Sequence, residues 1–183
     1  MKILVFETDG NALSERATLY PDSSVITTRK PLFLPEWSDS FATRVALAVR
    51  ICRLGNHVEL KFAHRYWDAA TVCLVTSDAQ ASQPDALSQA FDGAIALGEW
   101  VEMDAEARNY MVVDTMTGDP TWNNASEQLA RLADEAIVAA SQRMTIKMGD
   151  VFCLAVVEKR NISIGDTLRV GLNGREILTI KIK

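Results

Sequence analysis

The segment 43–51 alternates strictly between large apolar side chains and small or cationic ones. Successive side chains of a β-strand point to opposite faces of its sheet, whereas a helix repeats every 3.6 residues. The segment is therefore predicted to be a strand with one oily face and one face of small or cationic side chains. The oily face comprises Val45, Leu47, Val49 and Ile51, and the other face comprises Arg44, Ala46, Ala48 and Arg50.

Shorter patterns predict the remaining elements before the last forty residues. Strands are expected at 2–6, 57–60, 71–75, 93–101 and 110–115. Helices are expected at 12–18, 62–70, from Pro84, and at 125–142. The last of these is long and amphipathic, and Asn124 followed by Glu127 has the form of a capping box at its start.

Three turn signals organise the C-terminal part of the chain. Gly149-Asp150 and Gly165-Asp166 each lead into a β-like segment, and Asn173-Gly174 is a strong hairpin signal. We therefore expect the last forty residues to form an antiparallel β segment. Its strands are predicted at 151–157, 167–172 and 176–182.

Composition restricts the class of partner. The chain has 183 residues, of which 48% are hydrophobic and 23% charged, which is an ordinary globular mixture for one domain. A formal net charge of −5 without dense runs of Lys or Arg argues against nucleic-acid binding. The apolar run near the N-terminus is too short for a signal peptide, and no run matches a membrane span. We expect a cytoplasmic protein.

The cysteines and histidines do not form a metal-binding pattern. Cys52, Cys73 and Cys153 are far apart and lie among apolar neighbours, so buried thiols are expected rather than a disulfide. With His57 and His64 as the only histidines, and no C-x-x-C pair, the sequence lacks the spacing of a zinc site.

Several phrases, taken in order, resemble short bacterial members of the fumarylacetoacetate hydrolase (FAH) family. The resemblance extends from about residue 30 to residue 183 and more loosely over the start. It is carried by KPLFLP at 30–35, LAVRI at 47–51, RLGN at 53–56, FAHRY at 62–66, FDG at 91–93, ALG at 96–98, the helix at 125–142 and the two Gly-Asp turns.

The resemblance implies a mainly β (α+β) fold. Members of the family share a mixed β-roll with flanking helices. For this chain we expect such a β-roll with flanking short helices and one long amphipathic helix. We expect a single domain over 1–183, with a degenerate N-terminal region at 1–40 and the β-roll core at 41–183. Family members pair as homodimers and use Mg²⁺, Mn²⁺ or Ca²⁺, held by carboxylates, to hydrolyse a carbon–carbon bond in acylpyruvate-like β-diketo acids, or to decarboxylate or isomerise related compounds.

The sequence departs from the family at its functional positions. The family's Glu-x-Glu metal motif corresponds to Arg44 and Ala46, its third carboxylate falls near Val75, and a family Lys corresponds to Gln89. The family's Thr-Gly-Thr-Pro turn reads LAVV at 154–157, and its lid His, which follows an Asn-Tyr pair near the N-terminus, is missing because the first His is His57. No catalytic residue, metal ligand or bound cofactor is therefore expected.

The exchanges reverse the charge of the former metal site, from about −3 to about +1, and a guanidinium there would repel a divalent cation by several kcal/mol. Arg44 is accordingly a candidate for binding a carboxylate or phosphate, although a surface or ion-paired Arg that fills space is the favoured explanation. Two functions stay open. One is a catalytically inactive protein that acts by binding a small anionic metabolite, a second copy or an active family paralogue. The other is a divergent metal-dependent hydrolase of β-diketo acids whose ligands have moved to Glu99, Glu102 and Asp104.

Overall fold

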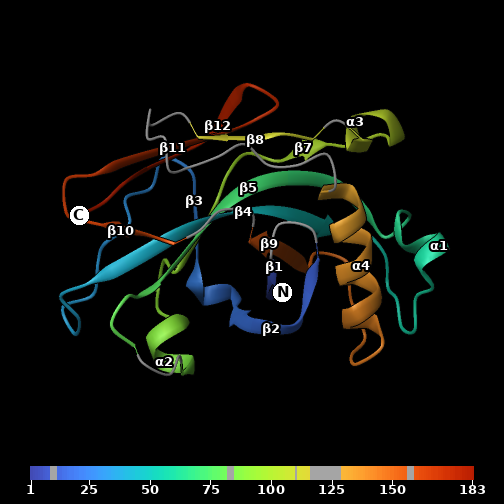
Figure 1. Cartoon of the computed structure of the whole chain (residues 1–183), viewed down its shortest axis with the longest axis horizontal. Helices are drawn as coiled ribbons and strands as arrows, with labels where there is room; N and C mark the ends of the chain where they lie inside the picture. Colours follow the sequence, from blue (N-terminus) through green and yellow to red (C-terminus); the bar gives the residue numbers. More distant parts are fainter. Residues whose placement is uncertain (9–11, 82–84, 110, 116–128, 156–158) are drawn as a thin grey trace.

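Two β-sheets carry most of the structure in the computed structural model of the chain (Figure 1). It describes residues 1–8, 12–81, 85–109, 111–115, 129–155 and 159–183. The elements in chain order are β1 (Lys2–Thr8), β2 (Leu13–Pro21), η1 (Asp22–Ser24), β3 (Val25–Thr27), β4 (Phe41–Ile51), α1 (Leu60–Ala63), β5 (Trp67–Asp78), α2 (Ala86–Gln89), β6 (Ile95–Leu97), β7 (Val101–Glu102), α3 (Ala105–Asn109), β8 (Val113–Thr115), α4 (Leu129–Ser141), β9 (Val151–Ala155), β10 (Arg160–Ile162), β11 (Thr167–Leu172) and β12 (Arg175–Lys181).

The larger sheet is mixed and is centred on β4. Its order is β2-β1-β9-β4-β5-β6-β3, with β10 pairing with β4 and β7 pairing with β5. β4 runs antiparallel to β5 along almost its whole length and antiparallel to β9 on its other side. β1 and β9 run parallel, with Ile3 opposite Val151. The predicted strand at 43–51 is thus confirmed, and it occupies the middle of the sheet.

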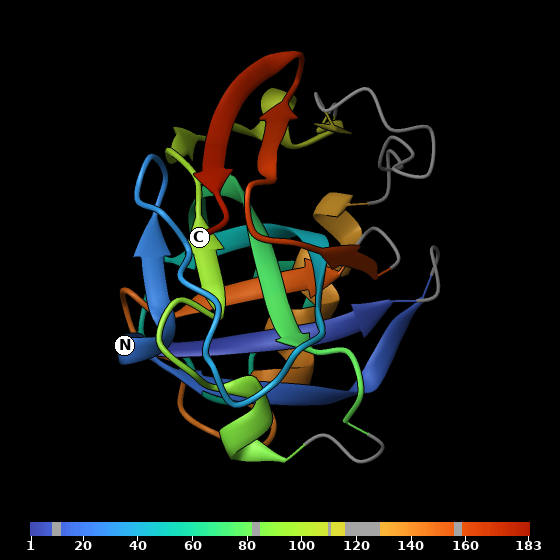
Figure 2. The same ribbon diagram turned by 90° about the vertical axis from the view of Figure 1, so that its left-hand side faces the viewer.

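The smaller sheet has the order β12-β11-β8. Its hairpin β11–β12, red in Figure 2, stands at the top of that view, beyond the strands of the larger sheet. Asn173 and Gly174 link the two strands with φ angles of 54° and 73°, in the left-handed region that tight hairpin turns require. The hairpin predicted from Asn173-Gly174 is confirmed.

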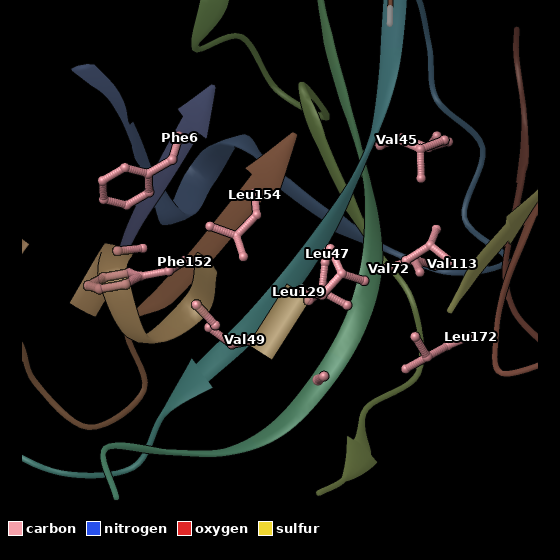
Figure 3. Close-up of a cluster of buried hydrophobic side chains, with 14 of the residues drawn as sticks. Phe6, Val45, Leu47, Val49, Val72, Val113, Leu129, Phe152, Leu154 and Leu172 are labelled. Atoms are coloured by element: carbon pink, nitrogen blue, oxygen red, sulfur yellow. The ribbon is translucent and has the colours of Figure 1, made fainter. Parts of the chain in front are cut away.

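The two faces of β4 contribute to two separate apolar cores. The oily face packs with α4, with the smaller sheet and with strands on either side of β4 (Figure 3). Leu47 and Leu129, one from β4 and one from α4, are both almost fully buried in this core. Ala46 and Ala48, on the other face, belong to a smaller core that also includes Ile95 of β6.

The long amphipathic helix is present as α4. Its buried positions recur at helical spacing and lie toward the larger core: Leu129, Leu132, Ala133, Ala136, Ile137 and Ala140. The predicted start of the helix and its capping box at Asn124 lie outside the described residues. No helix in the described part of the chain is long and apolar enough to cross a membrane.

Three local predictions were wrong. The segment 12–18, predicted as a helix, lies in β2, because its backbone pairs with β1 in an antiparallel hairpin. The segment 57–60 is not a strand: His57 has a φ of 52°, and the chain turns there into α1. The helix expected at 62–70 is limited to α1, because from Trp67 onward the chain extends as β5.

The prediction for the last forty residues was wrong in its topology. β9 does not join the C-terminal hairpin but enters the larger sheet between β1 and β4. β10 also belongs to that sheet, so only β11 and β12 form the expected antiparallel pair. The mainly β architecture with flanking helices is confirmed.

Candidate functional site

The β4–β5 register brings together three of the positions that the resemblance assigns to metal ligands. Arg44 lies opposite Val75, and Ala46 lies opposite Cys73. Residues two apart on a strand share a face, and Val75 and Cys73 belong to the same core as Ala46. Arg44, Ala46 and Val75 are therefore neighbours on one face of the larger sheet, as a shared site requires.

Apolar packing surrounds two of these positions. Ala46 is fully buried and Val75 is 6% exposed. They pack among Ile95, Cys153 and other members of the smaller core. Neither side chain carries an oxygen that could act as a ligand for a hard cation, and Arg44 is a cation itself. These three residues do not fit a bound Mg²⁺, Mn²⁺ or Ca²⁺.

Arg44 lies at the edge of this core and is only 17% exposed along its side chain. Its guanidinium forms an ion pair with the carboxylate of Glu7 at the end of β1, and the Glu7 side chain is 51% exposed. Burial lowers the pKa of Arg44. The guanidinium is thus a largely buried cation with one described carboxylate partner, which itself extends into solvent.

Two further polar groups lie beside Arg44. Arg160 of β10 pairs with Thr43, which places Lys159, one residue earlier, next to Arg44 on the side of β4 away from β5. Burial lowers the pKa of Lys159, and the neighbouring charge of Arg44 lowers it further. On β5, Ser77 follows Val75 on the same face and lies opposite Ala42.

The smaller core also contains two thiols and a phenol. Cys73 and Cys153 are buried, and a hydrogen bond between them together with burial raises the pKa of Cys73 well above its usual value. Burial and the two neighbouring thiols raise the pKa of Tyr20 to about 12. Because the thiolate or phenolate is the nucleophilic form, Cys73 and Tyr20 are held in their unreactive neutral forms.

Gln89 lies outside the β4–β5 pairing that makes the other three positions neighbours. It ends α2, a short helix whose start is capped by the Asp85 side chain, which accepts hydrogen bonds from the backbone N–H groups of Leu87 and Ser88. Ala90 and Phe91, which follow, pack against the smaller core. Gln89 itself is half-buried.

The acidic residues near β7 are occupied elsewhere. Glu99 forms ion pairs with Arg29 at 3.2 Å and Arg175 at 3.6 Å, and Glu102 accepts a hydrogen bond from Arg50 at 3.0 Å. Asp104 accepts a hydrogen bond from the backbone N–H of Ala107 at 2.7 Å. Among the described residues, no group of three or more His, Cys, Asp or Glu side chains is arranged to hold a metal ion.

Sequence reasoning did not identify Glu7, Ser77 or Lys159 as members of the site. The strand predicted at 2–6 stops just before Glu7, and the one at 71–75 stops before Ser77, so extending each strand by two residues would have placed both side chains. Lys159 carries no local signal, because its position depends on the pairing of β10 with β4.

Comparison with known proteins places this arrangement in a family. The family profile described as fumarylacetoacetate (FAA) hydrolase C-terminal matches residues 9–182. The chain belongs to the FAA hydrolase family. The resemblance stated from the sequence phrases is thereby confirmed. A search of curated proteins found no match.

Solved structures share the fold. The 5-carboxymethyl-2-hydroxymuconate delta-isomerase of Mycobacterium smegmatis is 20% identical over 99% of this chain and 78% of its own, with a TM-score of 0.82. The 2-hydroxyhepta-2,4-diene-1,7-dioate isomerase of Mycobacterium marinum is 18% identical over 99% and 73%, with a TM-score of 0.84. The fumarylpyruvate hydrolase of Pseudomonas aeruginosa, solved with Mn²⁺ and pyruvate, is 13% identical over 100% and 89%, with a TM-score of 0.83. The FAH-like fold expected from the sequence is confirmed.

Proposed function

We propose that the chain is a non-catalytic member of the FAA hydrolase family that acts by binding, either to a small anionic ligand or as an oligomeric partner of itself or of an active family paralogue. One observation carries the proposal: Arg44, Ala46 and Val75, which correspond to the family's metal-binding carboxylates, are adjacent on one face and offer no oxygen ligand. The fumarylpyruvate hydrolase of Pseudomonas aeruginosa was solved with Mn²⁺, and none of these three side chains is a ligand for such a cation.

Electrostatics supports the proposal. A guanidinium about 4 Å from a divalent cation opposes its binding by several kcal/mol at an effective dielectric constant near 20. The ion pair cancels the charge of Glu7 against that of Arg44, so the pair presents no net negative charge to attract a metal. The carboxylates of Glu99 and Glu102 are likewise in ion pairs, which argues against a relocated metal site at β7.

A direct test measures metal binding and hydrolysis separately. Titration of the purified protein with Mn²⁺ in a calorimeter is expected to give no saturable heat. Incubation with Mn²⁺ and acetylpyruvate or fumarylpyruvate is expected to leave the diketo absorbance unchanged, with the Pseudomonas aeruginosa fumarylpyruvate hydrolase as the positive control. Metal-dependent loss of that absorbance would refute the proposal and favour the divergent hydrolase.

The oligomeric part of the proposal has its own measurement. Light scattering on a size-exclusion column gives the mass of the protein in solution, and a mass of twice the 20.2 kDa chain is expected for a homodimer. A monomer at all concentrations would remove self-association and leave binding of a ligand or of a family paralogue.

A further inference from the structure

Three residues with hydrogen-bond donors occupy neighbouring strand positions at one end of β4. Arg44 is on β4, Lys159 precedes β10 on one side of it, and Ser77 lies on β5 at the other side. Ala42 and Arg44 share a face of β4, and Ser77, opposite Ala42, lies diagonally across from Arg44. Diagonal neighbours on adjacent strands are within reach of a long side chain such as that of Arg44.

Ser77 carries an unexplained polar group. The residue is only 8% exposed, and its hydroxyl oxygen is buried without a hydrogen-bond partner within the part of the chain that the structure describes. A buried hydroxyl left without a partner destabilises the fold. Thr43 and Thr76, on the opposite face of the same two strands, by contrast satisfy each other at 3.2 Å. The hydroxyl of Ser77 is therefore available to donate a hydrogen bond to a ligand on its face of the strands.

Two acidic side chains, Glu7 and Asp78, interact with the cations of this group. Glu7 pairs with Arg44, but its half-exposed side chain can turn into solvent. Asp78 attracts Lys159, yet one of its carboxylate oxygens already accepts hydrogen bonds from Ser38 at 3.0 Å and from the backbone N–H of Gln80 at 2.9 Å. An incoming anion therefore competes chiefly with Glu7.

We propose that Arg44, Lys159 and Ser77 form a binding site for the oxyanion group of a small molecule, a carboxylate or a phosphate, and that Glu7 occupies Arg44 when the anion is absent. The proposal rests on the proposed non-catalytic function and names its ligand class. The guanidinium matches the two oxygens of a carboxylate or phosphate, the ammonium adds a point charge, and the hydroxyl donates the remaining hydrogen bond.

Calorimetric titration with oxalate and with inorganic phosphate tests the site. Saturable binding of at least one probe is expected to the wild type, and Glu7→Gln is expected to bind it several-fold more tightly because Arg44 no longer has a competing carboxylate. Arg44→Ala is expected to weaken binding at least tenfold, and Ser77→Ala and Lys159→Met several-fold each. Binding of oxalate but not phosphate identifies a carboxylate ligand, and the reverse identifies a phosphate.

The matched control is Arg50→Ala, which removes a guanidinium from the same face at the other end of β4 and is expected to leave anion binding unchanged. Circular dichroism establishes whether each variant is folded. If Arg44→Ala does not fold, Arg44→Met replaces it, because methionine keeps an apolar side chain packed where the aliphatic part of Arg44 lies. Absence of binding to both the wild type and Glu7→Gln, or undiminished binding to a folded Arg44 variant, overturns the site. The Mn²⁺ hydrolysis assay is independent of this outcome, so the anion site and the non-catalytic function can fail separately.

Discussion

Two arginines stand at opposite ends of the same face of β4, and their surroundings differ. Arg50 donates to Asp68 at 2.9 Å and to Glu102 at 3.0 Å, and its guanidinium lies 5.8 Å from the ring centre of Trp100. Its pKa is raised, chiefly by the hydrogen bond to Asp68. Arg44 is more buried, has Glu7 as its described ion-pair partner, and has a pKa lowered by burial.

The difference separates a structural arginine from a candidate ligand-binding one. Two carboxylates and an aromatic ring stabilise the charge of Arg50 within the protein itself. Arg44 lies beside a second cation, Lys159, with fewer compensating charges, and an external anion would supply what is missing. The residue type and the face are the same, so the partners alone assign the roles.

The largest effect on stability is expected from the middle of the strand, not from either end. Leu47→Ala removes a fully buried side chain from the larger core and is expected to lower the free energy of unfolding by about 2–5 kcal/mol. Urea unfolding measures the loss. A smaller loss than that of Glu7→Gln or Asp68→Asn, which affect the two ends of β4, would show that the ends and not the oily face stabilise the strand.

The next largest effect is expected from removing one carboxylate partner at each end of β4, and the loss of unfolding free energy is expected to differ between the ends. Glu7→Gln leaves the largely buried Arg44 without its described ion-pair partner and is expected to cost about 1–2 kcal/mol of unfolding free energy. Asp68→Asn at the other end is expected to cost less than about 0.5 kcal/mol, because Arg50 keeps Glu102 and Trp100. Equal losses in urea unfolding would erase the distinction between the two arginines.

The smallest effect is expected from Lys159. The pKa of Lys159 is lower in the folded protein than the usual 10.5, so the folded state binds the proton of this ammonium less well than the unfolded state does. The charged Lys159 therefore lowers the free energy of unfolding at neutral pH. This destabilisation is lost as the pH rises through the folded and then the unfolded pKa. Lys159→Met is expected to raise the melting temperature at pH 7 by about 1 °C, with the gain vanishing above about pH 10.5. A lower melting temperature would mean that the attraction to Asp78 outweighs the proximity of Arg44.

Local pattern predicted the elements whose pairing is local. The alternation in 43–51 predicted β4 because both of its faces are buried in different cores, and Asn173-Gly174 predicted the hairpin because a two-residue turn fixes its own register. The segment 12–18 has no such internal determinant. Its strand conformation comes from hydrogen bonds to β1, and a local sequence pattern carries no information about that pairing.

The candidate site was likewise predictable only where its residues lie on the strand that the local pattern identified or in the family resemblance. Alternation placed Arg44 and Ala46 on one face, and the family resemblance added Val75, which the register of β5 then put opposite Arg44. Strand alternation says nothing of Gln89, because it lies in α2 and not in β4 or β5. Glu7 and Lys159 reach Arg44 through the pairing of β1 with β9 and of β10 with β4, and these pairings have no signature in the residues themselves.

The position of β9 between β1 and β4 bears on how the chain is made. Lys2 and Asp150, which are joined by hydrogen bonds, are 148 residues apart in sequence, so the N-terminal hairpin β1–β2 cannot gain its neighbouring strand until most of the chain has left the ribosome. At typical rates of synthesis this delay is on the order of 10 s. During that interval the apolar residues of β1 lack their native cover and stay exposed to aggregation.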